Sequence, residues 1–352
     1  MQFTTLYGII LNVKRKGKGL QKATKRENKM KKLYFMTLDC ETATLPFANE
    51  MCKNASQKQK IAIAKPLIYD LGWTISDRQG NIVDRKSFLI QETFFVPNVF
   101  NTAYYRDKRP MYMEKLEQGL IEVATWEQAT EQMVLALEHC DLALAYNACF
   151  DFKKALPFTE RYMKALYSAN YQKWEDNQRK KCQNILCGCD NSSNPDYLKP
   201  FFEFRGIKYP IADLWGLACD RLINIPKYKN FCLENELLTK SGIFFKTSAE
   251  TTFRYLLKQY DFIEEHTALA DAEIECEILT KVLKKGRIEP QIREFPFREL
   301  GETVDYVLRE KPKYKDTVRD FIIRYEEENG HLWSCPYATR IQNIIFRLGG
   351  YC

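Results

Sequence analysis

Short apolar segments alternate with amphipathic segments along most of the chain, and this alternation predicts an α/β fold. Residues 33–38 and 141–146 are nearly continuous apolar runs that are rich in strand formers and short for helices, so we expect two buried strands. Residues 68–75 and 82–90 predict two more strands. The turn-forming residues 77–81 between them predict an antiparallel hairpin.

Helical periodicity marks several of the remaining segments. Residues 126–139 and 268–285 each carry one apolar face, and residues 313–328 and 339–348 repeat this pattern near the C-terminus. Residues 248–259 begin with Ser-Ala-Glu, which predicts a capped helix start. We therefore expect helices that flank the predicted strands.

Two acidic residues end the first predicted strand. Asp39 and Glu41 are separated by one residue, so the alternation of side chains along a strand places both on the same side. Two carboxylates that converge on one point repel each other unless cations lie between them. The alternative is a solvated strand end that carries two unrelated acids.

A third carboxylate follows the second buried strand. Asp151 lies near the junction between residues 141–146 and a helix that we expect to start at Phe152. Such junctions commonly carry functional groups in open α/β sheets. We expect Asn147 to shape the turn. In the alternative interpretation, Asp151 only caps the helix.

The third acidic patch also contains a histidine. His266, one of three histidines in the chain, precedes the helix predicted over residues 268–285, and Asp271 lies more than one turn further on. The four carboxylates are the oxygen ligands that a pair of Mg²⁺ or Mn²⁺ ions requires. The histidine is placed to act as a base on a water molecule. This combination predicts phosphodiester hydrolysis, whereas a histidine that only caps the helix is the alternative.

The three patches resemble the three motifs of the DEDDh exonucleases, the DnaQ-like group that includes the proofreading epsilon subunit of the bacterial replicative polymerase and ribonuclease T. The resemblance covers residues 31–285, with an interruption at residues 157–208. Residues 266–272 read His-Thr-Ala-Leu-Ala-Asp-Ala and are the most specific part. A histidine there, rather than a tyrosine four residues before the aspartate, matches the DEDDh branch.

The resemblance implies a ribonuclease H-like α/β fold, with a mixed five-stranded sheet and flanking helices, to which this chain adds an insert and a C-terminal helical extension. It implies that two Mg²⁺ or Mn²⁺ ions are held by four carboxylates: Asp39, Glu41, Asp151 and Asp271. His266 would act as the general base, a role that requires a neutral imidazole. The products would be nucleoside 5′-monophosphates, released from 3′ ends.

The resemblance also implies where the substrate is contacted. Thr42 and Ala43 follow the first motif, where the backbone of the family approaches the terminal nucleotide. Asn147 is a further candidate contact, and Phe150 would stack on a base or, in the favoured alternative, pack in the core. Residues 209–218 resemble the edge-strand segment of the family, and we expect Asp213 within them to be structural.

The resemblance divides the chain into an exonuclease domain, residues 31–285, and flanking additions. Residues 1–30 form a basic extension, which we expect to be disordered and to contact nucleic acid unless translation begins at Met30. The insert at residues 157–208 is a candidate substrate clamp or partner surface. Residues 286–352 would form a lid, a docking element or, as we favour, a packing element.

Composition adds three expectations. The net charge of +7, from 53 basic and 46 acidic residues, suits a polyanionic partner only modestly. The 12 cysteines are mostly scattered, as in reduced cytoplasmic proteins, and the absence of a run of 18 apolar residues predicts no membrane partner. Three cysteines in the insert, Cys182, Cys187 and Cys189, either hold a structural Zn²⁺ ion or are free thiols.

Three functions remain open on the sequence alone. The first is a 3′–5′ exonuclease on DNA 3′ ends, with single-stranded DNA favoured and with proofreading or repair beside a separate DNA polymerase as the setting. The second is an exoribonuclease of the same family, because chemistry at the phosphate ignores the sugar. The third is a non-catalytic module that binds nucleic acid, which would not need four carboxylates and a histidine.

Overall fold

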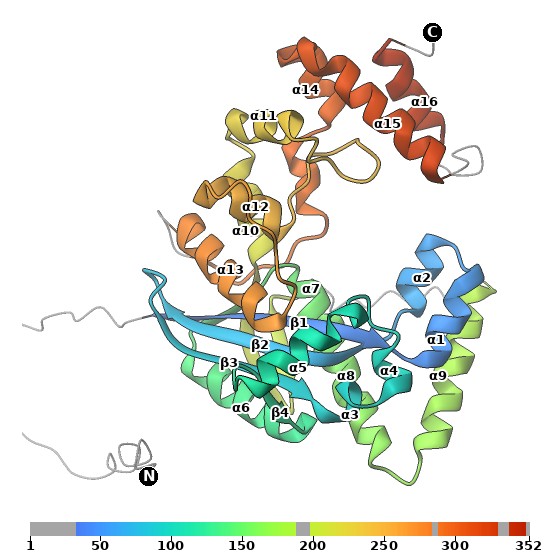
Figure 1. Cartoon of the computed structure of the whole chain (residues 1–352), viewed down its shortest axis with the longest axis vertical. Coiled ribbons are helices and arrows are strands. Elements are labelled where there is room, and N and C mark those ends of the chain that lie inside the picture. Colours follow the sequence, from blue (N-terminus) through green and yellow to red (C-terminus); the bar gives the residue numbers. More distant parts are fainter. Residues whose placement is uncertain (1–32, 188–197, 284–287, 330–337, 350–352) are drawn as a thin grey trace, which may run out of the picture. The chain divides into compact units, whose positions relative to one another are not determined.

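A seven-stranded mixed sheet lies at the centre of the fold, and helices pack on both of its faces (Figure 1). The computed structural model describes residues 33–187, 198–283, 288–329 and 338–349. The basic extension and Cys189 are outside these ranges. Among the described residues, no helix has the length and apolar character needed to cross a membrane.

The strands are arranged in the order β4-β3-β2-β1-β5-β7-β6. β1 pairs antiparallel with β2 and parallel with β5, while β3 pairs antiparallel with β2 and β7 parallel with β5. The bounds, in chain order, are β1 (Tyr34–Thr44), β2 (Pro66–Asp77), β3 (Ile82–Ile90), β4 (Glu122–Ala124), β5 (Leu142–Ala145), β6 (Phe201–Phe204) and β7 (Ile207–Asp213).

The expected α/β class is confirmed, but the expected number of five strands is wrong. β4 and β6 are additional strands at the two edges of the sheet, with three and four residues. Strands this short have no readable alternation of apolar and polar residues. Because β6 pairs with β7, the expected placement of residues 209–218 at the sheet edge is also wrong.

The first strand is longer than its apolar run predicts. β1 continues to Thr44 and pairs with β2 along its whole length, with Glu41 opposite Asp70 and a register shift between Glu41 and Thr42, where Tyr69 of β2 is skipped. Asp39 and Glu41 therefore lie within the strand and not at its end, as we had expected. One face of β1 carries Met36 and Leu38 into the main core, while the other face carries the acidic residues.

Most of the predicted helices are confirmed. α6 (Trp126–His139) has the predicted bounds, and α13 (Ala268–Val282), α12 (Ala249–Leu257), α15 (Lys315–Asn329) and α16 (Ala338–Arg347) lie where periodicity placed them. The helix near the second acidic patch starts at Ala148, four residues earlier than predicted. The other helices are α1 (Pro46–Met51), α2 (Gln57–Ile63), α3 (Gln91–Phe94), α4 (Pro97–Phe100), α5 (Arg109–Glu117), α7 (Ala148–Phe150), α8 (Leu156–Leu166), α9 (Tyr171–Leu186), α10 (Leu214–Leu222), α11 (Pro226–Glu234) and α14 (Thr303–Glu310).

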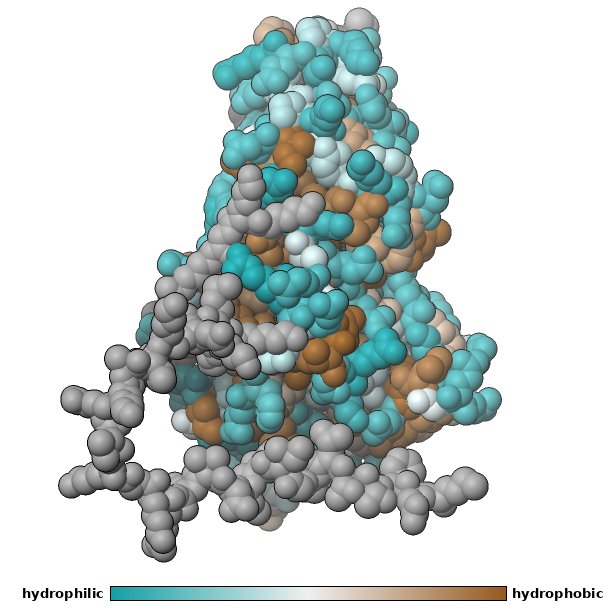
Figure 2. Space-filling view, turned by 90° about the vertical axis from the view of Figure 1, so that its left-hand side faces the viewer, coloured by the Kyte–Doolittle hydropathy of each residue, from teal (hydrophilic) through white to brown (hydrophobic). Residues whose placement is uncertain are grey.

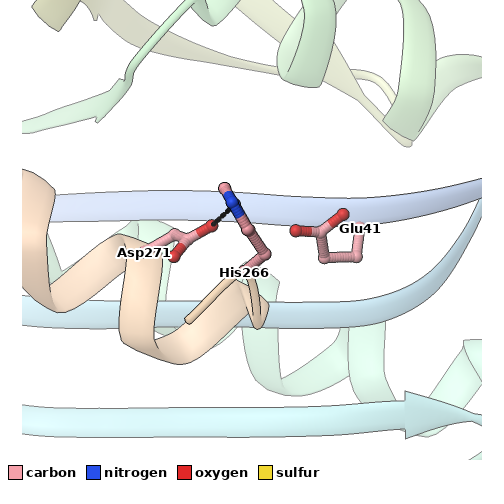
Figure 3. A group of neighbouring side chains, drawn as sticks. All are labelled: Glu41, His266 and Asp271. Carbon is pink, nitrogen blue, oxygen red and sulfur yellow. Dashed lines mark ion pairs between the residues drawn. The ribbon is translucent and has the colours of Figure 1, made fainter. Parts of the chain in front are cut away.

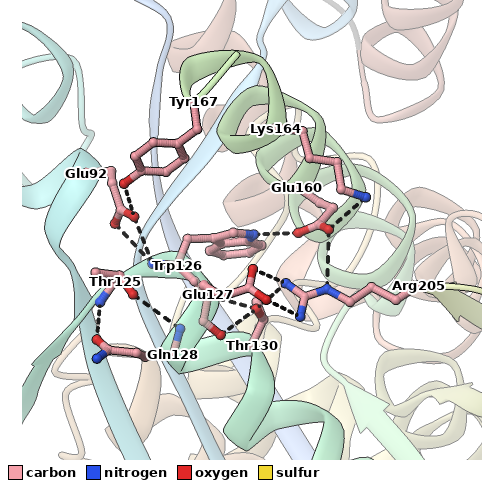
Figure 4. Close-up of polar contacts among 10 residues, drawn as sticks. All are labelled: Glu92, Thr125, Trp126, Glu127, Gln128, Thr130, Glu160, Lys164, Tyr167 and Arg205. Carbon is pink, nitrogen blue, oxygen red and sulfur yellow. Dashed lines mark hydrogen bonds and ion pairs between the residues drawn. The ribbon is translucent and has the colours of Figure 1, made fainter.

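The insert at residues 157–208 shares the main apolar core. It contributes most of α8, together with α9 and β6, and Cys182 of α9 is fully buried in that core. The turn between β6 and β7 places Arg205 against α6 and α8, where its guanidinium pairs with Glu127 and Glu160 (Figure 4). Trp126 Nε1 donates a hydrogen bond to Glu160 Oε2 at 2.6 Å. The insert is therefore held to the sheet domain by buried and paired side chains.

Residues 288–329 and 338–349 complete a second apolar core with the segment that contains α10 and α11. Val304 and Val307 of α14, Ile322 of α15 and Ile345 of α16 are fully buried there. This burial agrees with the packing role that we favour for the C-terminal extension. On the face that Figure 2 shows, hydrophobic patches are interspersed with hydrophilic residues.

Candidate metal centre

Three of the five predicted residues form a compact group. Glu41 of β1, His266 just before α13 and Asp271 of α13 each offer one ligand atom, and these atoms all lie within 4.8 Å of one another (Figure 3). His266 Nδ1 is 3.8 Å from Asp271 Oδ2. Two carboxylates and an imidazole from segments far apart in the sequence thus face one point.

Asp39 and Asp151 lie outside this group of three but belong to the same electrostatic cluster. Burial raises the pKa of Asp39 well above its usual value, and the nearby charges of Asp151 and Asp271 raise it further. Burial also raises the pKa of Asp151 to about 7, although a hydrogen bond from the Cys40 thiol opposes this shift. Cys40 Sγ donates this bond to Asp151 Oδ1 at 3.2 Å.

The carboxylates of the cluster cannot all be ionised without a counter-charge. Burial raises the pKa of Glu41 to about 9, and the charges of Asp271 and Asp70 add to the shift, while Lys108 opposes it. The Lys108 ammonium also donates a hydrogen bond to the carbonyl of Glu265. A divalent cation would remove the repulsion directly.

Two buried oxygens test whether cations fit. Asp271 Oδ1 and Glu275 Oε2 are buried and accept no hydrogen bond from the described residues. Buried polar atoms are nearly always satisfied in folded proteins, so an unpaired oxygen calls for an ion or a water molecule. The donor set around them contains carboxylates, which suit Mg²⁺ and Mn²⁺. The residues present therefore fit the cations that the sequence predicts.

His266 is held in an unusual backbone conformation. Its φ of 56° lies in the left-handed region, which costs a residue other than glycine about 1–3 kcal/mol. The Tyr105 ring stacks on the imidazole with centroids 4.5 Å apart, and Lys108 Nζ lies over the Tyr105 ring, 4.8 Å from its centroid. Carboxylates of Glu264 and Asp271 face Nδ1 at 3.5 and 3.8 Å. Negative charge at Nδ1 favours a proton there, which leaves Nε2 as the basic nitrogen.

The start of α13 is fixed against β2. Asp70 Oδ2 accepts a hydrogen bond from the Ala268 N–H at 2.9 Å, which satisfies one of the free donors at the helix start. Gly72 lies opposite Asp39 in the sheet, and a Cβ there would meet Leu269 N at 2.4 Å. The sheet and helix can approach this closely only because residue 72 has no side chain. Asp271 is thereby brought to the acidic face of β1.

Sequence reasoning missed several residues of the cluster. Glu264 faces His266, Asp70 caps α13, and Glu275 lies one turn beyond Asp271. Asp70 and Gly72 interrupt an apolar strand at alternate positions, which is a readable sign of a close helix contact. Glu275 gave no such sign, because a glutamate in a helix is normally exposed.

The predicted substrate contacts have mixed surroundings. Ala43 is buried in the core, and Phe150 is partly buried against that core, in agreement with the alternative that we favoured for Phe150. Thr42 is half-buried, next to the register shift between β1 and β2. Asn147 is exposed, has a φ of 84° and lines a cavity beside the carboxylates. These positions leave Asn147 as the best placed of the four to meet a ligand through its side chain.

Asp213 has a structural environment, as we expected. Its Oδ1 accepts hydrogen bonds from the N–H groups of Asn147 and Ala148, and its Oδ2 accepts one from Gly216. It therefore ties the turn after β5 to the start of α10. Burial raises the pKa of Asp213 to about 6, while these backbone donors stabilise its charged form.

A cavity of about 410 Å³ opens beside the cluster. Asp39, Asp271 and Glu275 line one part of it, and Lys246 lines it as well. The Trp215 and Phe297 rings stack on each other with centroids 5.6 Å apart, and both contribute to the wall. The cavity thus combines a carboxylate cluster with aromatic surface and a cation.

The cysteines of the insert have contrasting positions. Cys182 is fully buried, and Cys187 is exposed at the end of α9. Within the described part of the chain, Glu41, His266 and Asp271 form the only group of three or more His, Cys, Asp or Glu residues whose ligand atoms all lie within 4.8 Å of one another, and no cysteine belongs to it. The hypothesis of a zinc site therefore depends on Cys189, which is outside the described residues.

Comparison with known proteins gives no match: no family model, no curated protein and no solved structure matches this chain.

Proposed function

We propose that this protein is a metal-dependent 3′–5′ exonuclease of the DEDDh type, which releases nucleoside 5′-monophosphates from the 3′ ends of single-stranded DNA. The observation that carries the proposal is the grouping of Glu41, His266 and Asp271 within 4.8 Å. A proton acceptor beside carboxylates that can hold cations can catalyse the hydrolysis of a phosphodiester.

The sheet supports the ribonuclease H-like part of the proposal. Antiparallel β1, β2 and β3 are followed by parallel β5 and β7, and β1 lies in the middle of the order. The acidic residues come from β1, from the helix after β5 and from α13, which packs on β1 and β2. Three distant motifs therefore meet on the central strands, as the proposed family requires.

The reaction would divide among the residues of the site as follows. Asp39, Glu41, Asp151 and Asp271 would hold Mg²⁺ or Mn²⁺, which lowers the pKa of water and offsets charge on the phosphate. His266 would accept the proton of the attacking water at Nε2, while Glu264 and Asp271 hold the opposite side of its ring. Tyr105 keeps the imidazole plane in place by stacking on it.

The cavity supports a nucleic-acid strand as the substrate. Aromatic surfaces bind bases by stacking, and a lysine attracts phosphates, so Trp215, Phe297 and Lys246 suit a single strand. Among the described residues, Lys246 forms no ion pair that would occupy its charge. The net charge of +7 acts in the same direction.

The proposal is tested by incubating single-stranded DNA, duplex DNA and RNA, each labelled at the 5′ or 3′ end, with the full chain and Mg²⁺ or Mn²⁺. We expect stepwise shortening from the 3′ end that stops with chelator and in Asp271→Ala. Asp261→Ala, which removes an exposed aspartate ten residues earlier, is the matched control and should remain active. RNA cleaved in preference to DNA would assign an exoribonuclease, and no cleavage by folded protein would contradict the proposal.

A further inference from the structure

Glu275 is a buried carboxylate without a counter-charge. It lies on α13 four residues after Asp271, so both side chains project from the same face of the helix. Its side chain is only 2% exposed and lines the cavity together with Asp39 and Asp271. No lysine, arginine or histidine pairs with it among the described residues.

The two oxygens of Glu275 have different surroundings. Oε1 accepts a hydrogen bond from the Tyr146 N–H at 3.0 Å, just beyond the end of β5. Oε2 is buried and has no hydrogen-bond partner in the described part of the structure. One oxygen is therefore anchored to the backbone while the other is left without a protein ligand beside the carboxylate cluster.

Packing does not account for this residue. The neighbouring buried residues of α13, Ile274, Ile278 and Leu279, show that the helix fills its core-facing positions with apolar side chains. Oε2 receives no hydrogen bond from the described residues. A charged Glu275 needs a cation, and no lysine, arginine or histidine in the described part of the chain pairs with it.

We propose that Glu275 is a fifth carboxylate ligand of the divalent-cation site, in which Oε2 binds the cation while Oε1 stays bonded to Tyr146. This inference rests on the proposed metal-dependent function. It assigns to the site a ligand that lies outside the residues matching the DEDDh motifs. Asp271 Oδ1 and Glu275 Oε2, the two buried oxygens without partners, would then both face the cation.

The test is the affinity of the full chain for Mn²⁺. It is measured by electron paramagnetic resonance, which detects free Mn²⁺, and by calorimetry. Glu275→Gln retains an oxygen for the Tyr146 N–H but removes the charge, and we expect its Mn²⁺ affinity to fall at least about tenfold. Glu277→Gln makes the same change at an exposed position of α13 and should bind as the wild type does. Glu275→Asp keeps the charge on a shorter side chain, so its Mn²⁺ affinity should lie between those of Glu275→Gln and the wild type.

Thermal unfolding supplies a second readout that does not depend on activity. In chelator, Glu275→Gln should melt higher than the wild type, because the substitution removes a buried charge without a partner. With saturating Mn²⁺, the wild type should melt at a higher temperature than Glu275→Gln. Equal Mn²⁺ affinity in Glu275→Gln and the wild type would overturn the inference and leave the proposed function standing. Failure of the wild type to bind Mn²⁺ would overturn both.

Discussion

At the scale of single residues, the site depends on the orientation of one imidazole. His266 adopts a left-handed backbone conformation that its neighbours must maintain, and the stacked Tyr105 ring is the largest of these contacts. The pairing of Lys115 with Glu265, next to His266, ties the same loop to α5. The base is therefore positioned by residues outside the three motifs.

This arrangement predicts a clear difference between two Tyr105 variants. Tyr105→Ala removes the stacked ring, an interaction worth about 0.5–1.5 kcal/mol, so kcat should fall by about two- to tenfold while Mn²⁺ binding is unchanged. Tyr105→Phe keeps the ring and should retain most of the activity. Steady-state kinetics of both variants check the prediction, and equal losses would show that the hydroxyl, not the stacking, is what matters.

A second residue-scale prediction concerns Lys246 in the cavity wall. Lys246→Ala removes a cation that we place near the phosphates of the strand, so KM should rise several-fold with little change in kcat. The logarithmic salt dependence of binding should also become shallower by about one unit. Binding measured by fluorescence anisotropy across a salt series checks this, and an unchanged slope would place the strand elsewhere.

At the scale of elements, the junction between α13 and the sheet brings the site together. Thr37 Oγ1 donates a hydrogen bond to the Ala272 carbonyl at 2.9 Å, and Asp70 and Gly72 hold the first turn. These contacts align His266 and Asp271 with the acidic face of β1. The precision of the site is thus a property of helix–strand packing.

Gly72→Ala should disrupt this junction. The added Cβ would meet backbone atoms of Ala268 and Leu269 at 2.4–2.7 Å, and backbone cannot move aside as a flexible side chain can. We expect the free energy of unfolding to fall by about 2 kcal/mol or more, with a parallel loss of activity. Gly119→Ala is a useful comparison, because its Cβ meets nothing within 4 Å and only the φ of +70° opposes it. Urea unfolding that finds equal costs for both would contradict the close approach.

Elements with strong local patterns were predictable from the sequence. α6 was predicted at both ends from its periodic apolar face, and in the structure Thr125 and Gln128 form a capping box at its start. The second half of β1 was missed because its outward positions carry Asp39 and Glu41, which interrupt the apolar run. β4 and β6 were missed because tertiary pairing, not local pattern, creates such short strands.

The candidate site was predictable only where spacing in the sequence carried information. Asp39, Glu41, His266 and Asp271 follow recognisable local patterns, whereas Glu275 acquires its role from Tyr146, which is distant in the sequence. Asp151 was identified, although it lies within a helical segment and not at its expected start. The hydrogen bond that joins Glu275 of α13 to Tyr146 at the end of β5 has no counterpart in the local sequence.

At the scale of the whole molecule, the carboxylate cluster opposes folding when no cation is present. Burial, Asp271 and Asp70 raise the pKa of Glu41 from 4.5 to about 9, and burial raises that of Asp151 from 3.8 to about 7. A carboxyl group with a raised pKa stabilises the fold fully below its unfolded pKa, and this contribution is lost as the pH rises through the folded value. The metal-free protein should therefore lose stability between about pH 4 and pH 9.

Differential scanning calorimetry checks this prediction. In chelator, the Tm of the wild type should fall between pH 5.5 and pH 8.5 by about 5 °C or more beyond the fall that Asp271→Asn shows over the same range. Mn²⁺ should raise Tm more at pH 8.5 than at pH 5.5, because protons compete with the cation for the carboxylates. Asp271→Asn should show a flatter pH dependence and a smaller response to Mn²⁺. An identical Mn²⁺ response at both pH values would contradict the account.

The central claim is hydrolysis of the terminal phosphodiester at a 3′ end. Its most direct test is the identity of the first product that the wild type releases from single-stranded DNA labelled in its last internucleotide phosphate, in the presence of Mg²⁺. We expect a labelled nucleoside 5′-monophosphate as the first product. Release of longer oligonucleotides, or of a nucleoside 3′-monophosphate, would contradict it.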